Sequence, residues 1–150
     1  MPEPVSVCAV RLPAEPTTVD YVHNQLERLW LAADHVPLPD RMAFDLAVIE
    51  TVSNTVRHGV GDPGPVEVGI DLTATPIELL ATITEYGAAE PRVDAAAYRD
   101  SMDEVLDDAQ QVLAESGRGL AMIQTLVSLG FEREGTTNVW RLRRRTSVPV

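Results

Sequence analysis

The sequence contains no lysine. Its 12 basic residues are all arginines, and they stand against 23 aspartates and glutamates, which gives a formal net charge of −11. Affinity for a nucleic-acid backbone comes from clustered cations, so this balance argues against direct binding of DNA or RNA. A basic surface on another protein would be a better electrostatic match.

Cysteine is almost as scarce as lysine. Cys8 is the single one, which excludes an internal disulfide and argues against a cysteine-based zinc site. It lies in a stretch that alternates between apolar and polar residues. We therefore expect Cys8 to be a small buried strand residue rather than a nucleophile.

Long apolar runs are missing too. None approaches the roughly 18 residues that a membrane span requires, and the N-terminus lacks the basic and apolar regions of a secretory signal. We therefore expect a cytoplasmic protein without membrane association. The hydrophobic share of 45% and the charged share of 23% are ordinary for a globular chain, and 150 residues suffice for one core. We expect a single domain over residues 1–150.

Hydrophobic periodicity and turn residues divide the chain into helices and strands. Three helices are predicted: from Thr17 or Thr18 to about 36, over 44–59, and from Gly117 to about 129. Strands are predicted over 5–12, 66–72, 77–84, 131–133 and 139–143. Prolines at positions 37 and 39 separate the first two helices, and Asp40 is a reasonable start for the second. The predicted fold class is α+β: a two-layer sandwich with a mixed, mostly antiparallel sheet and helices on one face.

The predicted helix at 44–59 has two distinct faces. Its apolar stripe comprises Phe44, Ala47, Val48, Thr51, Val52, Thr55 and Val56. Glu50, Asn54 and His58 follow one another at four-residue steps, so they form one polar row that drifts by about 40° per step. We expect this row to face away from the core.

A carboxylate and an amide in one row can carry out connected chemistry. Glu50 can accept a proton from a hydroxyl nucleophile, and the side-chain oxygen of Asn54 suits Mg²⁺, which proteins usually hold through few groups plus phosphate oxygens. The plainer interpretation is a solvated helix face, since exposed Glu and Asn four residues apart are common.

Two later segments favour the chemical interpretation. Gly117, Arg118, Gly119 and Leu120 open the third predicted helix, where free backbone N–H groups favour a phosphate, and Arg118 can contact a phosphate in place of lysine. Glu85, Tyr86 and Gly87 end the strand at 77–84 with a carboxylate and a glycine. A lone G-x-G is a weak signal by itself, and its alternative is a helix start with a flexible entry.

The order of these motifs resembles the GHKL ATPases, and within them the anti-sigma-factor serine/threonine kinases of bacterial partner switching. The resemblance implies that Mg²⁺ and ATP bind, with Asn54 on the metal and Glu50 as the catalytic base. The cofactor contacts that it implies are Asn54, His58, Glu85, Gly87, Gly117, Arg118, Gly119, Leu120 and Thr137. The sequence departs from the family pattern D-x-G-x-G at Glu85 and Ala89.

The segment at about 88–116 corresponds to the variable lid of the family. It is rich in acidic residues, which would repel a triphosphate, and a plain amphipathic helix is the alternative to a moving lid. The implied partners are a sigma factor, which is sequestered, and an anti-sigma-factor antagonist, which is phosphorylated; a homodimer is implied as well. The alternatives are a nucleotide-binding module that acts only by sequestration and another GHKL function.

Overall fold

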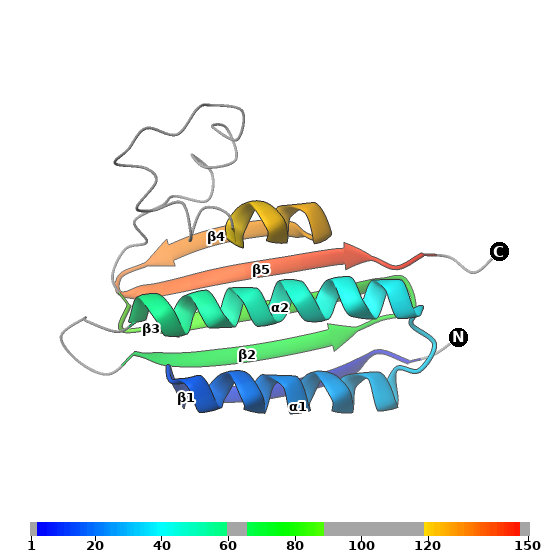
Figure 1. Cartoon of the computed structure of the whole chain (residues 1–150), viewed down its shortest axis with the longest axis horizontal. Coiled ribbons are helices and arrows are strands. Elements are labelled where there is room, and N and C mark those ends of the chain that lie inside the picture. Colours follow the sequence, from blue (N-terminus) through cyan, green and yellow to red (C-terminus); the bar gives the residue numbers. More distant parts are fainter. Residues whose placement is uncertain (1–2, 60–65, 89–118, 148–150) are drawn as a thin grey trace.

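The computed structural model describes residues 3–59, 66–88 and 119–147, and one antiparallel sheet organises them (Figure 1). Its five strands in this part of the chain are β1 (Val5–Pro13), β2 (Glu67–Ala74), β3 (Glu78–Tyr86), β4 (Ser128–Glu134) and β5 (Thr137–Arg145). They lie in the order β1-β2-β3-β5-β4, and every pair of neighbours is antiparallel. The predicted hairpins are confirmed, and the described strands contain no parallel pair.

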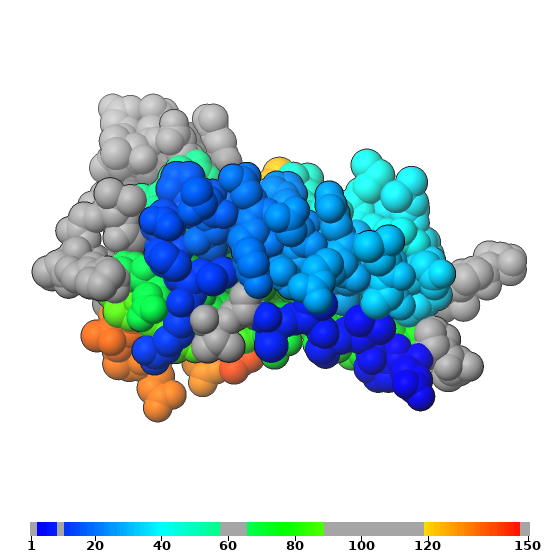
Figure 2. Space-filling view, turned by 90° about the horizontal axis from the view of Figure 1, so that it is seen from below, coloured from blue at the N-terminus to red at the C-terminus, as the bar shows by residue number. Residues whose placement is uncertain are grey.

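The helices α1 (Pro16–Ala32), α2 (Leu38–Gly59) and a helix at 119–126 lie along one face of this sheet (Figure 1). Figure 2 shows the layers from the side, with α1 in blue above and β1 in dark blue and the β4–β5 hairpin in orange below. Alternate residues of each strand point toward the helices and join one buried cluster with them. The α+β two-layer fold predicted from the sequence is therefore confirmed.

Helix α1 buries the apolar stripe that its periodicity predicts: Val22, Leu26, Leu29 and Trp30. The predicted threonine cap is wrong. Glu15 is the N-cap, without a side-chain cap bond, and Pro16 occupies the first turn, where a missing N–H costs little. The hydroxyl of Thr18 instead donates back to the carbonyl of Pro13 at 2.5 Å. The helix also ends earlier than predicted, at Ala32.

Helix α2 begins at Leu38, just before its predicted start at Asp40, because Pro39 falls in its first turn, where no backbone donor is required. Its predicted apolar stripe, from Phe44 to Val56, is buried throughout. Trp30 of α1 donates its indole N–H to Asp45 at 2.8 Å and packs edge-on against Phe44. Burial raises the pKa of Asp45, although the hydrogen bond from Trp30 and the nearby cations oppose the rise.

The register of the sheet corrects two predictions. Cys8 is exposed rather than buried, because Val5 and Val7 take the inward positions of β1 and Cys8 lies opposite Asp71 on the uncovered face. Ser128 and Leu129, predicted as the end of the third helix, belong to β4, since that helix ends at residue 126.

The proposed lid falls almost entirely within residues 89–118, so its prediction lies outside the described residues, and the same holds for Ala89. Among the residues that are described, no helix combines the length and the apolar character that a membrane crossing requires.

Candidate functional site

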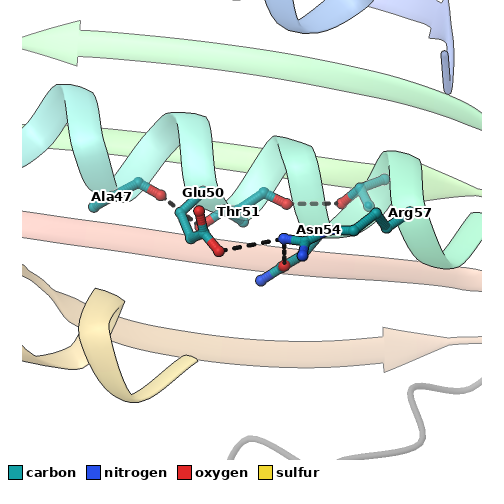
Figure 3. A network of polar contacts seen from close by, with 6 residues as sticks. Ala47, Glu50, Thr51, Asn54 and Arg57 are labelled. Carbon is teal, nitrogen blue, oxygen red and sulfur yellow. Dashed lines mark hydrogen bonds and ion pairs between the residues drawn. The ribbon is translucent and has the colours of Figure 1, made fainter. Parts of the chain in front are cut away.

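Glu50 and Asn54 lie one turn apart on α2, as the polar row predicts, and both are partly exposed. Figure 3 shows their side chains on the same side of the helix together with that of Arg57. Arg57 Nη2 donates to Asn54 Oδ1 at 2.6 Å and lies 3.3 Å from Glu50 Oε1. A guanidinium therefore neutralises the carboxylate and holds the amide oxygen in the described structure.

Gly119 brings the third segment of the site to this row. A Cβ at position 119 would lie 2.9 Å from Glu50 Oε1 and 3.1 Å from Asn54 Nδ2, closer than side-chain atoms ordinarily approach. Glycine fits here without displacing the ends of these two side chains. The start of the helix at 119–126 therefore lies directly against Glu50 and Asn54, as expected if the three act together.

The carboxylate of Glu85 lies next to the same part of α2. Its Oε1 accepts hydrogen bonds from Thr55 Oγ1 at 3.1 Å and from the indole of Trp140 at 2.5 Å. Its Oε2 accepts one from Asn138 Nδ2 at 3.3 Å. Thr55 directly follows Asn54 on α2. The hydrogen bond from Thr55 therefore places Glu85, at the end of β3, next to the polar row of this helix.

Arg133 of β4 fixes the orientation of Asn138. Its guanidinium donates to Asn138 Oδ1 at 2.6 Å and to the carbonyl of Ala88 at 3.2 Å. With its oxygen held by Arg133, the fully buried amide of Asn138 turns its NH₂ group toward Glu85. This chain of bonds sets the direction in which the Glu85 carboxylate points.

The remaining predicted contacts fall in different places. Gly87 has a φ of 73°, a left-handed conformation that favours glycine, and it turns the chain away from β3. Leu120 is buried in the core. Thr137 pairs with Tyr86, so the alternation of β5 puts it on the opposite face from Asn138 and Glu85. Gly117, Arg118 and the side chain of His58 lie outside the described residues.

The residues present fit a metal ion that arrives with a nucleotide. Asn54 supplies a neutral oxygen and Glu50 a carboxylate, both close to the backbone of Gly119. In residues 3–59, 66–88 and 119–147, no group of three or more His, Cys, Asp or Glu side chains could hold a metal. Mg²⁺ usually keeps several waters and binds through one or two protein groups plus phosphates, so this sparse set is suitable for it.

Three residues of this site were missed by the sequence prediction. Arg57 carried a usable signal, because it lies three residues after Asn54 and seven after Glu50, and both spacings bring helix positions onto one side. For Asn138 and Trp140, the only signal in the sequence was their alternation within a predicted strand, which places them on one face but not beside Glu85. Their approach to Glu85 depends on how β3 pairs with β5, which the sequence alone does not specify.

Comparisons with known proteins agree with this fold. Residues 12–144 match the family described as the histidine kinase-like ATPase domain. A search among curated proteins found no match. The solved structure of the RsbU and RsbW domains of Rv1364c from Mycobacterium tuberculosis is similar, with a TM-score of 0.62 and 20% identity over 97% of this chain. This chain spans about a third of that one, 33% of its length.

A second similar structure is the SiaB–SiaC complex from Pseudomonas aeruginosa, with a TM-score of 0.48 and 15% identity, covering 93% of this chain and 89% of that one. At 20% identity, the similarity to the first of these two structures shows the fold alone. The site therefore has to be interpreted from its own geometry.

Proposed function

Because the chain belongs to the family of histidine kinase-like ATPase domains, we propose that it is an ATP-binding anti-sigma factor with serine/threonine kinase activity. It would sequester a sigma factor and phosphorylate a serine or threonine of an anti-sigma-factor antagonist. The observation that carries this proposal is the juxtaposition of Glu50 and Asn54, one turn apart on α2, with Gly119 from a segment far away in the sequence. A cytoplasmic homodimer, without direct contact to nucleic acid, is part of the same proposal.

Each residue of the site has a separate task in this proposal. Mg²⁺·ATP would supply the phosphoryl group and the charge neutralisation that its transfer requires. Asn54 Oδ1 would ligate the metal, and the backbone at Gly119 would face the phosphates. Glu85 would accept from the adenine amino group, next to Gly87. Glu50 would accept the proton of the partner's hydroxyl group.

A second function is a nucleotide-binding switch that acts only by sequestration. Arg57 favours it, because its guanidinium lies 3.3 Å from Glu50 Oε1 and occupies the carboxylate that would have to face the partner's hydroxyl group. Glu85 in place of aspartate, and the acidic residues between 88 and 116, also favour it. Both functions require nucleotide binding, and only the first requires Glu50 as a base.

Binding and phosphate transfer, measured on the same variants, test the two functions. Calorimetry with ATP and with ADP, each with Mg²⁺, should give a heat of binding for the wild-type chain. Glu50→Gln should keep near-normal nucleotide affinity and lose about 10²- to 10⁴-fold in labelled-phosphate transfer to an antagonist protein, the usual contribution of general acid–base catalysis. Asn54→Ala should lose both, because it removes a proposed ligand of the ion that bridges the phosphates.

The outcomes separate the two proposals. A wild-type chain that binds nucleotide and its protein partners but transfers no phosphate with Mg²⁺ or Mn²⁺ supports sequestration alone. No heat and no thermal stabilisation at millimolar nucleotide would refute both, since a ligand that binds only the native state must raise its stability.

A further inference from the structure

Arg57 occupies the polar atoms that the proposed function assigns to other groups. Its Nη2 lies 2.6 Å from Asn54 Oδ1, the proposed metal ligand, and 3.3 Å from Glu50 Oε1, the proposed proton acceptor. Both bonds come from one nitrogen, and Figure 3 shows the three side chains gathered on one side of α2. A positive charge of the protein itself therefore lies where a cation would bind.

Asn54 Oδ1 has a second lone pair, but a metal ion bound to it would still be repelled by Arg57. Mg²⁺ binds such an oxygen at about 2.1 Å, so an ion on the free lone pair would lie about 4 Å from Arg57 Nη2. Like charges at this separation repel, and a partly exposed site screens the repulsion only in part. The arrangement in Figure 3 is therefore unfavourable for a bound metal ion.

Arg57 can leave Asn54 without disturbing the fold. Its side chain is 49% exposed, whereas Asn54 and Glu50 are fixed on one rigid helix. A change of side-chain rotamer would release Asn54 Oδ1 and move the guanidinium into solvent or toward a ligand. No change of the backbone is needed, because the partners are three and seven residues away on the same helix.

We propose that Arg57 is a resident cation of the ligand-free site, which Mg²⁺ has to displace from Asn54, so that Arg57 sets the Mg²⁺ concentration at which nucleotide binds. This inference rests on the proposed function, because it assumes that Mg²⁺ and a nucleotide occupy this site. It makes Arg57 a positioning residue that regulates loading, and it requires no phosphate transfer.

The test is a titration with Mg²⁺ at a fixed concentration of ADP, which binds without being consumed. Arg57→Gln keeps a hydrogen-bonding side chain and removes the charge, so the half-saturating Mg²⁺ concentration should fall about three- to tenfold, the effect of one partly screened charged hydrogen bond. Arg57→Lys keeps the charge and should stay close to the wild type. The ADP affinity at saturating Mg²⁺ is measured in parallel, to separate the metal requirement from a direct contact with phosphate.

Arg141→Gln is the matched control. Arg141 is also partly exposed, is paired with a glutamate at 2.6 Å and lies on the uncovered face of the sheet, so its loss changes the net charge equally without touching the site. An unchanged or higher Mg²⁺ requirement in Arg57→Gln, or an equal fall in Arg141→Gln, would overturn the inference and leave the proposed function intact. Absence of ADP binding by the wild type would refute the proposed function, and this inference with it.

Discussion

Glu85 shows how a single residue of this site joins several elements of the fold. Its carboxylate offers about four acceptor positions. Trp140 takes one on Oε1 and Asn138 takes one on Oε2, while the one hydroxyl proton of Thr55 lies within reach of both Glu85 Oε1 and the carbonyl of Thr51. At least one position is left for an external donor such as an adenine amino group. The same side chain therefore joins α2, β3 and β5 and keeps one acceptor available for a ligand.

Replacing Glu85 by glutamine should destabilise the fold. Both oxygens of Glu85 accept hydrogen bonds, whereas glutamine has one oxygen and one NH₂ group. The NH₂ group would face a donor from Trp140, Thr55 or Asn138, and that donor would lose its partner in a partly buried place. We expect a loss of about 1–3 kcal/mol in the free energy of unfolding. Urea denaturation followed by circular dichroism measures this loss.

Glu132→Gln is the control for that measurement. Glu132 pairs with Arg141 at an exposed position, so its replacement should change stability by less than about 1 kcal/mol. If both variants unfold at the same urea concentration, the three donors to Glu85 contribute no net stability.

At this scale, the sequence predicts those residues whose proximity depends on one helix. Glu50 and Asn54 needed only the helical repeat, and Arg57 was within reach of the same reasoning. Trp140 and Asn138 were not, because they lie 55 and 53 residues from Glu85 and meet it only through strand pairing. Thr137 was expected near the adenine site, but strand alternation turns it to the other face.

Among the elements, the end of β5 is tied to two helices by Arg144. Its Nε donates to Asp40 Oδ1 at 2.9 Å, and its Nη1 donates to the carbonyl of Leu126, where the helix at 119–126 ends. The backbone N–H of Ser147 donates to Asp40 Oδ2 at 2.9 Å. Burial alone would raise the pKa of Asp40, but the hydrogen bonds from Ser147 and Arg144 and the guanidinium charge outweigh it and lower that pKa.

This lowered pKa predicts how the stability depends on pH. The ionised Asp40 contributes stability that is fully present above the unfolded pKa of about 4 and is lost as the pH falls through the lower folded value. Asp40→Asn should therefore cost about 2–4 kcal/mol at pH 7, because it leaves the guanidinium without its charged partner. The difference from the wild type should shrink below about pH 4.

Thermal or urea unfolding of both proteins between pH 3 and pH 7 checks this. Arg143→Gln serves as a control, since Arg143 pairs with Glu78 at 2.6 Å but is half exposed. Its cost should be below about 1 kcal/mol. A stability difference between wild type and Asp40→Asn that stays constant over this pH range would contradict the assigned role of the carboxylate.

The elements themselves were predictable in kind but less so in extent. The apolar stripes of α1 and α2 and the alternation of the β2–β3 hairpin are local patterns, and all were confirmed. The start of α2 at Leu38 was missed because prolines at 37 and 39 were interpreted as breaks, whereas a first helical turn tolerates them. Asp40 was expected near the start of this helix and lies in its first turn, but its bond to Arg144, 104 residues away, was not predicted.

The whole molecule assembles the candidate site from segments that are distant in the sequence. The sheet holds Glu85, α2 carries Glu50 and Asn54, and the helix at 119–126 brings Gly119 against them. Arg144 ties the far end of that helix to the start of α2 through Leu126 and Asp40. Arg144 of β5 thus connects the two helices at one end, and at the other end Gly119 lies in close contact with Glu50 and Asn54.

This arrangement makes position 119 a test of function that is separate from a test of folding. In Gly119→Ala, the new Cβ would lie 2.9 Å from Glu50 Oε1 and 3.1 Å from Asn54 Nδ2, so the ends of these side chains would have to shift. We expect ADP·Mg²⁺ affinity to fall about three- to tenfold, since such displacements cost about 0.5–1.5 kcal/mol. The melting temperature should stay equal or rise, because alanine favours a helix over glycine by about 1 kcal/mol.

Gly130→Ala supplies the comparison, because a Cβ there would lie 3.9 Å from its nearest neighbours, an ordinary van der Waals contact. Calorimetry of both variants gives the ADP·Mg²⁺ affinity, and thermal unfolding gives the melting temperature. A local clash at the site predicts weaker binding with undiminished stability in Gly119→Ala and unchanged binding in Gly130→Ala. If Gly119→Ala binds ADP as tightly as the wild type, the space beside Glu50 and Asn54 is not where the nucleotide lies, and the site must be sought along another part of α2.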